Sequence, residues 1–302
     1  MSNRYENLFR SLRERGEGAF VPFLMLGDPT PEDTLDIVRT VVAAGADALE
    51  LGVPFSDPVA DGPTLQASHL RALAAGATVD SALEQVRTIR SEFPELPIGM
   101  LIYGNVAFTR GFERFYSEFA KAGADSILLP DVPVREGAPF IAAAEKAGID
   151  PIFIAPARAT ASTLEGVAHS SRGYIYAISR DGVTGTERES KTIGLEEVVV
   201  NINRFDGPPV LLGFGISAPE HVRDAVAAGA EGAITGSAIT KIIDRHVSRE
   251  TAAERTQIEG TSGRARVDPA LHKELAEFVT RMKAATRKQS HNALNPSSAL
   301  DS

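Results

Sequence analysis

The feature that most constrains the fold is a junction that recurs along the chain. It reads AAGADALELG at 43–52, KAGADSILLP at 121–130, KAGIDPIFIA at 146–155 and AAGAEGAITG at 227–236. In each copy alanine ends a predicted helix, a glycine follows where a left-handed backbone costs least, and an apolar strand begins within a residue or two. Because each helix leads directly into a strand, the pattern indicates parallel strands joined by helices.

Apolar runs predict eight strands, at about 19–26, 46–52, 97–103, 124–130, 149–155, 173–178, 209–213 and 231–235. Eight strands alternating with helices are typical of the (β/α)8 or TIM barrel, an α/β fold. An open doubly wound sheet is the alternative. It is disfavoured because the strands follow one another without the long irregular connection that a second domain needs.

We expect one barrel domain over residues 1–287 with an extra N-terminal helix. Thr30-Pro31-Glu32-Asp33 and Ser217-Ala218-Pro219-Glu220 both resemble capped helix starts with proline in the first turn. Residues 247–268 form a polar insertion that we expect to be mobile, and 288–302 form a polar tail that we expect to be disordered in part.

Composition narrows the functional classes. The 302 residues are 43% hydrophobic, enough for the core of one barrel-sized domain. The net charge of −9 argues against a general nucleic-acid surface, and the absence of cysteine excludes disulfides, thiolate metal sites and cysteine nucleophiles. No segment approaches the roughly 18 apolar residues that span a bilayer, and the N-terminus lacks a signal-peptide run. We therefore expect a soluble cytoplasmic protein that binds neither nucleic acid nor membrane.

Two carboxylates stand out in the segment LELGVPFSDPVADGPTLQ at 49–66. Leu49 and Leu51 share one face of a buried strand, so Glu50 points to the other. The prolines and the Asp61-Gly62 turn hold the chain at the strand's C-terminal mouth, over which Asp61 can reach back. The alternative for a strand-end glutamate such as Glu50 is that it merely caps a loop.

This segment closely resembles LELGVPFSDPxADGPxIQ, the signature of the tryptophan synthase alpha chain family, with Leu65 at the isoleucine position. The resemblance extends from about Tyr5 to Lys241 and resumes over 269–287. It implies a lyase of tryptophan biosynthesis that cleaves indole-3-glycerol phosphate to indole and glyceraldehyde 3-phosphate. It also implies a beta-chain partner in an alpha2beta2 complex. No cofactor is expected in this chain, and pyridoxal phosphate is expected only in the beta partner. A free-standing indole-releasing lyase and a non-catalytic activating subunit are the alternatives.

By this resemblance, Glu50 carries both proton transfers, with a pKa raised by its apolar surroundings, and Asp61 stays ionised to accept the indole N–H bond. The indole pocket is implied to comprise Phe23, Leu101, Tyr103, Ile154, Tyr176 and Phe214, each of which could instead be a core residue. The partner contact is implied at Pro54, Asp57 and Pro58, which from the sequence alone are only an exposed turn.

Two strand-to-helix loops suit a phosphate group. Gly213-Phe214-Gly215-Ile216-Ser217 and Gly236-Ser237 both precede predicted helices, where backbone N–H groups and the helix dipole favour an anion. A tight turn is the alternative. The string GYxYxxSRxGVTG resembles the family's mobile loop, so Arg180, Gly182 and Thr184 are assigned to a lid, and Gly185 joins Gly215, Gly236 and Ser237 at the phosphate. Asp181 replaces a smaller residue and is expected to point outward or pair with Arg180.

Two competing aldolase chemistries lack the residues that they need. A Schiff-base aldolase needs a strand lysine, but all lysines fall on predicted helices, loops or the C-terminal region. A metal aldolase needs clustered ligands, but the six histidines are scattered and none lies on a predicted strand, so no metal site is expected. Carboxylate acid–base catalysis remains.

Overall fold

A closed barrel of parallel strands forms the centre of the computed structural model, which describes residues 4–178, 192, 194–247 and 268–288. The strands are β1 (Ala19–Met25), β2 (Leu49–Gly52), β3 (Ile98–Leu101), β4 (Ser126–Leu128), β5 (Asp150–Ile152), β6 (Ile154–Pro156), β7 (Ile175–Ile178), β8 (Val210–Leu212) and β9 (Gly232–Thr235). Their order is β5-β4-β3-β2-β1-β9-β8-β7-β6. The predicted (β/α)8 fold is confirmed.

The fifth predicted strand is divided into two segments at Phe153. Before this residue β5 pairs with β4, and after it β6 pairs with β7. The carbonyl of Phe153 itself accepts a bond of 3.2 Å from the amide of Tyr176. One stretch of chain therefore changes neighbours at a single residue, and this change closes the barrel.

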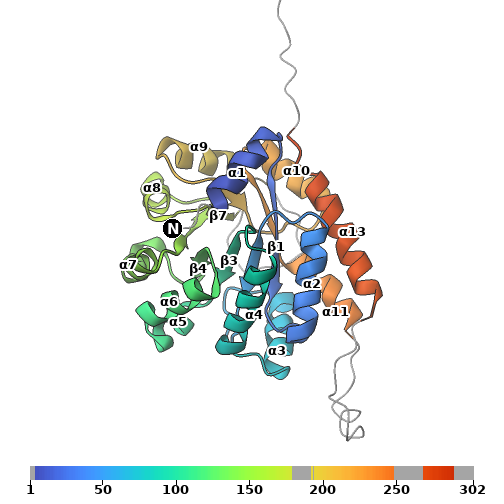
Figure 1. Cartoon of the computed structure of the whole chain (residues 1–302). Coiled ribbons are helices and arrows are strands. Elements are labelled where there is room, and N and C mark those ends of the chain that lie inside the picture. Colours follow the sequence, from blue (N-terminus) through green and yellow to red (C-terminus); the bar gives the residue numbers. More distant parts are fainter. Residues whose placement is uncertain (1–3, 179–191, 193, 248–267, 289–302) are drawn as a thin grey trace, which may run out of the picture.

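Helices surround the strands in Figure 1. They are α1 (Arg4–Glu14), α2 (Pro31–Ala43), α3 (Pro63–Ala74), α4 (Val79–Glu92), α5 (Gly104–Arg110), α6 (Phe112–Ala122), the 3-10 turn η1 (Val134–Glu136), α7 (Ala138–Ala147), α8 (Ala161–Ser170), α9 (Leu195–Arg204), α10 (Pro219–Ala227), α11 (Ser237–His246) and α13 (Ala270–Ala284). Within the described ranges, none of them is both long and apolar enough to cross a membrane. The predictions for the insertion and the tail fall on 248–267 and 289–302, which lie outside the described residues.

The predicted helix-to-strand junctions are confirmed. Gly45, Gly123, Gly148 and Gly229 all have φ between +76° and +107°, the left-handed region that a glycine enters at little cost. Thr30 caps α2 by accepting a bond from the amide of Asp33, as predicted. The predicted cap at Ser217 is wrong. Because Pro219 takes the first turn of α10, the cap position falls on Ala218, which has no side-chain oxygen to offer.

Strand alternation sorts side chains into two cores. Leu49 and Leu51 face outward, into the layer between strands and helices. Ala48, Phe23 and Tyr176 face inward, into a second cluster that fills the barrel. Glu50 alternates with Leu49 and Leu51 on β2 and is only 1% exposed, so its carboxyl group lies on the barrel side of the sheet.

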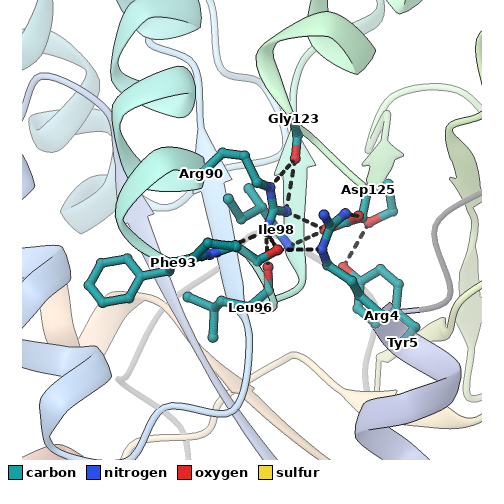
Figure 2. Close-up of polar contacts among 10 residues, drawn as sticks. Arg4, Tyr5, Arg90, Phe93, Leu96, Ile98, Gly123 and Asp125 are labelled. Atoms are coloured by element: carbon teal, nitrogen blue, oxygen red, sulfur yellow. Dashed lines mark hydrogen bonds and ion pairs between the residues drawn. The ribbon is translucent and has the colours of Figure 1, made fainter.

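Helix α1 covers the N-terminal end of the barrel, where a buried ion network fixes it (Figure 2). Asp125, whose side chain is 1% exposed, receives Arg4 at 2.8 Å and Arg90 at 2.7 Å, and it also accepts a bond from the amide of Ile98. Removing either arginine would weaken the compensation of a buried charge. The network holds Tyr5 inside the barrel, where its ring lies 5.4 Å from that of Tyr174.

Candidate active site

Glu50 lies where three strands meet. Its Cα pairs with Phe23 on β1 and Gly99 on β3. The hydroxyl of Tyr174 donates a 2.9 Å bond to Oε1 of Glu50. In the described part of the chain, Oε2 of Glu50 is buried and meets no hydrogen-bond partner. One oxygen is therefore held in place, while the other remains available for a proton.

The surroundings of Glu50 favour its protonated form. The pKa of Glu50 is raised to about 8. Burial is the largest cause, the bond from Tyr174 acts in the opposite direction, and the negative charge of Asp61 adds to the rise. A carboxyl group with this pKa is mostly protonated near neutral pH and can both give and take a proton there.

Asp61 follows β2 by a loop that returns over the barrel mouth. Its side chain is 8% exposed. Oδ2 of Asp61 accepts a 2.8 Å bond from the hydroxyl of Tyr103, and it lies 3.1 Å from Nε2 of His69. Two side chains on different elements, the β3–α5 junction and α3, thus converge on one carboxylate oxygen.

One pocket brings the two carboxylates together with apolar walls. It is lined by Phe23, Glu50, Asp61, Leu65, Leu101, Tyr176, Gly213, Phe214, Gly215, Ile216, Ile234, Gly236 and Ser237. Two residues assigned to the indole pocket do not line it. Tyr103 contacts Asp61 instead, and Ile154 lines a neighbouring groove with Pro130 and Ile178. The roles of all these residues stay predictions.

The glycine end of the pocket lies beside α11. Gly236 is the residue before this helix and Ser237 is its first residue. Gly215 has φ +74°, a conformation that other residues rarely adopt. Gly213 packs so closely on Tyr176 that an added Cβ would lie 2.0 Å from the ring. Backbone N–H groups and a helix start can therefore reach an anion without side-chain obstruction. Gly185 and the lid residues Arg180, Asp181, Gly182 and Thr184 lie outside the described residues.

The loop assigned to the partner is not uniformly exposed. Asp57 is exposed, but Pro58 is half-buried and Pro54 is buried. The expectation of an exposed turn is therefore wrong for Pro54, because Pro54 directly follows the buried Val53 at the end of β2. The apolar side chain of Val59, 74% exposed, stands on the same loop.

Sequence reasoning missed two residues that bond to the carboxylates. Tyr174 stands two positions before Tyr176, so strand alternation places both on the barrel side, and this signal could have found it. His69 gave no comparable signal. Its ring lies on the second turn of α3 and meets Asp61, which stands two positions before this helix, and periodicity within the helix does not reveal that contact.

The sequence matches the tryptophan synthase alpha chain family over residues 9–286. It is 70% identical to the tryptophan synthase alpha chain of Corynebacterium aurimucosum over 285 residues, 94% of this chain and 98% of the relative. Identity to the alpha chain of Vibrio parahaemolyticus is 50% over 286 residues, 95% of this chain and 100% of the relative. Among solved structures, tryptophan synthase subunit alpha from Legionella pneumophila str. Paris has a TM-score of 0.78 at 28% identity, covering 95% of this chain and 99% of that one. Mycobacterium tuberculosis tryptophan synthase has a TM-score of 0.79 at 25% identity, with coverages of 95% and 99%.

Proposed function

The chain belongs to the tryptophan synthase alpha chain family, and from this premise we propose that it cleaves indole-3-glycerol phosphate to indole and glyceraldehyde 3-phosphate. Its place in tryptophan biosynthesis is that of the alpha subunit. The observation that carries the specific reaction is the pairing in one pocket of Asp61 with Glu50, whose pKa is raised to about 8.

The raised pKa sets the order of the proton transfers. Glu50 starts protonated and gives its proton to C3 of the indole ring, which turns the ring into an electron sink. The bond from C3 to the glycerol carbon then breaks, and its electron pair returns to the ring. Meanwhile Glu50, now a carboxylate, takes the proton of the adjacent hydroxyl as that carbon becomes the aldehyde. Glu50 ends the cycle protonated, so no other acid or base is required.

Asp61 supplies the charge that this reaction needs. Protonation at C3 places a positive charge on the indole ring, and a carboxylate at the ring N–H stabilises that charge as it develops. The bonds from Tyr103 and His69 to Oδ2 hold the Asp61 side chain at the pocket wall.

The phosphate is assigned to the other end of the pocket, at Gly215, Gly236 and Ser237. This end supplies binding energy far from the breaking bond and thereby aligns the glycerol carbon with Glu50. Gly185 and the lid of Arg180, Gly182 and Thr184 complete this proposed site by resemblance to the family.

A beta chain is the proposed partner, because the chain belongs to the alpha chain family and resembles a structure of Mycobacterium tuberculosis tryptophan synthase. Docking is assigned to Asp57 and Pro58 on the loop that begins at the buried Pro54. An alpha2beta2 complex is the expected assembly, and pyridoxal phosphate is expected in the beta chain only. The cytoplasm is the expected location. Indole is small and apolar, so a partner that consumes it directly would limit its loss.

The test is indole release from indole-3-glycerol phosphate by the purified chain, measured with and without the beta chain of the same organism. We expect slow turnover alone and faster turnover in the complex, with a larger change in kcat than in KM. Fast turnover by the isolated chain, unaffected by the beta chain, would indicate the free-standing lyase. No indole in either condition would refute the proposed reaction.

A further inference from the structure

His69 lies between a backbone amide and the Asp61 carboxylate. The amide N–H of Phe55 donates a 2.9 Å bond to Nδ1 of the ring, and Nε2 lies 3.1 Å from Oδ2 of Asp61. The side chain of His69 is 2% exposed, so water does not compete for either nitrogen. Both ring nitrogens therefore face fixed protein partners.

The Phe55 amide determines the tautomer of this ring. A backbone N–H can only donate, so Nδ1 of His69 must offer its lone pair and cannot carry a proton. The ring proton then lies on Nε2 and is donated to Asp61. Hence the imidazole is neutral, and Asp61 receives from it a hydrogen bond without a positive charge.

This distinction matters for the chemistry. An imidazolium at the same place would pair with the carboxylate and offset the charge that the indole cation needs. A neutral donor fixes the direction of the carboxylate and leaves its negative charge in place. Tyr103, which also bonds Oδ2, is a neutral donor as well, and its hydroxyl accepts a 3.1 Å bond from the amide of Ala60.

We propose that His69 is a positioning residue for the alpha reaction, one that holds Asp61 by a neutral Nε2–H donor whose tautomer is fixed by the Phe55 amide. This inference rests on the proposed function, because it assigns to Asp61 the stabilisation of a cationic ring. His69 itself touches none of the reacting atoms and acts only through Asp61.

Two matched variants separate the two bonds of the ring. In His69→Gln the amide nitrogen reaches approximately the place of Nε2, so the donor to Asp61 is kept. In His69→Asn the shorter side chain reaches only to Nδ1, so the Phe55 bond is kept and the donor is lost. We expect His69→Asn to lower kcat between about 10-fold and about 100-fold, with a smaller change in KM, and His69→Gln to stay within about threefold of the wild type.

A double variant tests whether His69 acts through Asp61. With Asp61→Asn already present, adding His69→Asn should cause little further loss of kcat, because the charge to be positioned is gone. An equal loss of kcat in both backgrounds would overturn the proposal and indicate a general packing role. So would wild-type activity in His69→Asn.

A measurement on the unaltered full-length chain tests the tautomer without any assay of activity. Nitrogen-15 NMR of the histidine rings, with the His69 ring assigned by through-bond correlation to its own backbone resonances, should show a neutral ring protonated at Nε2 near neutral pH. An Nδ1–H ring or an imidazolium would overturn the inference, even if both variants failed to fold. A wild-type chain that releases no indole would instead refute the proposed function, so the two failures can be told apart.

Discussion

The hydroxyl of Tyr174 lies 2.9 Å from Oε1 of Glu50 and donates to it at the centre of the barrel. This bond lowers the pKa of Glu50, but burial raises it more strongly, so that the pKa is about 8 with the bond in place. Tyr174 thus keeps the proposed acid from becoming too weak to lose its proton.

Tyr174→Phe should move the alkaline limb of the pH profile of kcat/KM to higher pH than in the wild type. Loss of the donor leaves the Glu50 carboxylate less stabilised, so its pKa rises above about 8. Tyr5→Phe is the matched control, since that hydroxyl bonds Ser126 at 2.9 Å instead of Glu50. The same shift in both variants would contradict a specific role for Tyr174.

Glu50→Gln should lower kcat for indole release by at least about 100-fold, because general acid–base catalysis contributes that much. The amide keeps the shape of the side chain, so a substrate analogue should still bind. Calorimetric titration measures that binding, and steady-state assays measure the rate. Near-normal turnover would remove Glu50 from its proposed role.

Glu50 should also make the protein less stable as the pH rises. The folded-state pKa of about 8 exceeds the ordinary value of 4.5 for a glutamate, so the contribution of Glu50 to stability is full below about pH 4.5 and is lost as the pH rises through about 8. The free energy of unfolding of Glu50→Gln, minus that of the wild type, should rise over this window by up to about 1.4 kcal/mol per pH unit. Urea unfolding at several pH values measures it, and a flat difference would contradict the raised pKa.

Asp61→Asn should be severely impaired in kcat, since a neutral amide can contact the ring N–H but cannot balance a cation. Asp57→Asn is the control in the isolated chain, because it removes the same charge from an exposed position of the same loop. If Asp61→Asn kept most of its activity, the role of Asp61 would be structural, limited to capping its loop.

Gly236→Ala should raise the KM for indole-3-glycerol phosphate and leave Tm almost unchanged. An added Cβ at Gly236 would meet only ordinary contacts with Phe23, from 3.4 Å outward, so the fold can accept it. Gly215→Ala should lower Tm as well, because φ is +74° there. Equal KM in the wild type and Gly236→Ala would favour a simple turn at Gly236.

The barrel was predictable because its signals are local. A glycine after each alanine-rich helix end indicates αβ junctions, and the alternation of Leu49, Glu50 and Leu51 indicates which side chain faces inward. The division of the fifth strand at Phe153 was not predictable, because it depends on which neighbouring strand forms the backbone hydrogen bonds before and after that residue. His69 was missed for a related reason, since its contact with Asp61 depends on how the chain turns just before α3.

The ion pairs of Arg4 and Arg90 with Asp125 bear on where small molecules can enter and leave the barrel. By fixing α1, this network holds Tyr5, Phe9 and Leu12 in the N-terminal end of the barrel, where their side chains fill it. In the described part of the chain the pocket with Glu50 and Asp61 lies at the opposite rim, where the loop that carries Pro54 to Asp61 also lies. If the proposed reaction is correct, indole would leave at the rim that a docked partner is expected to contact.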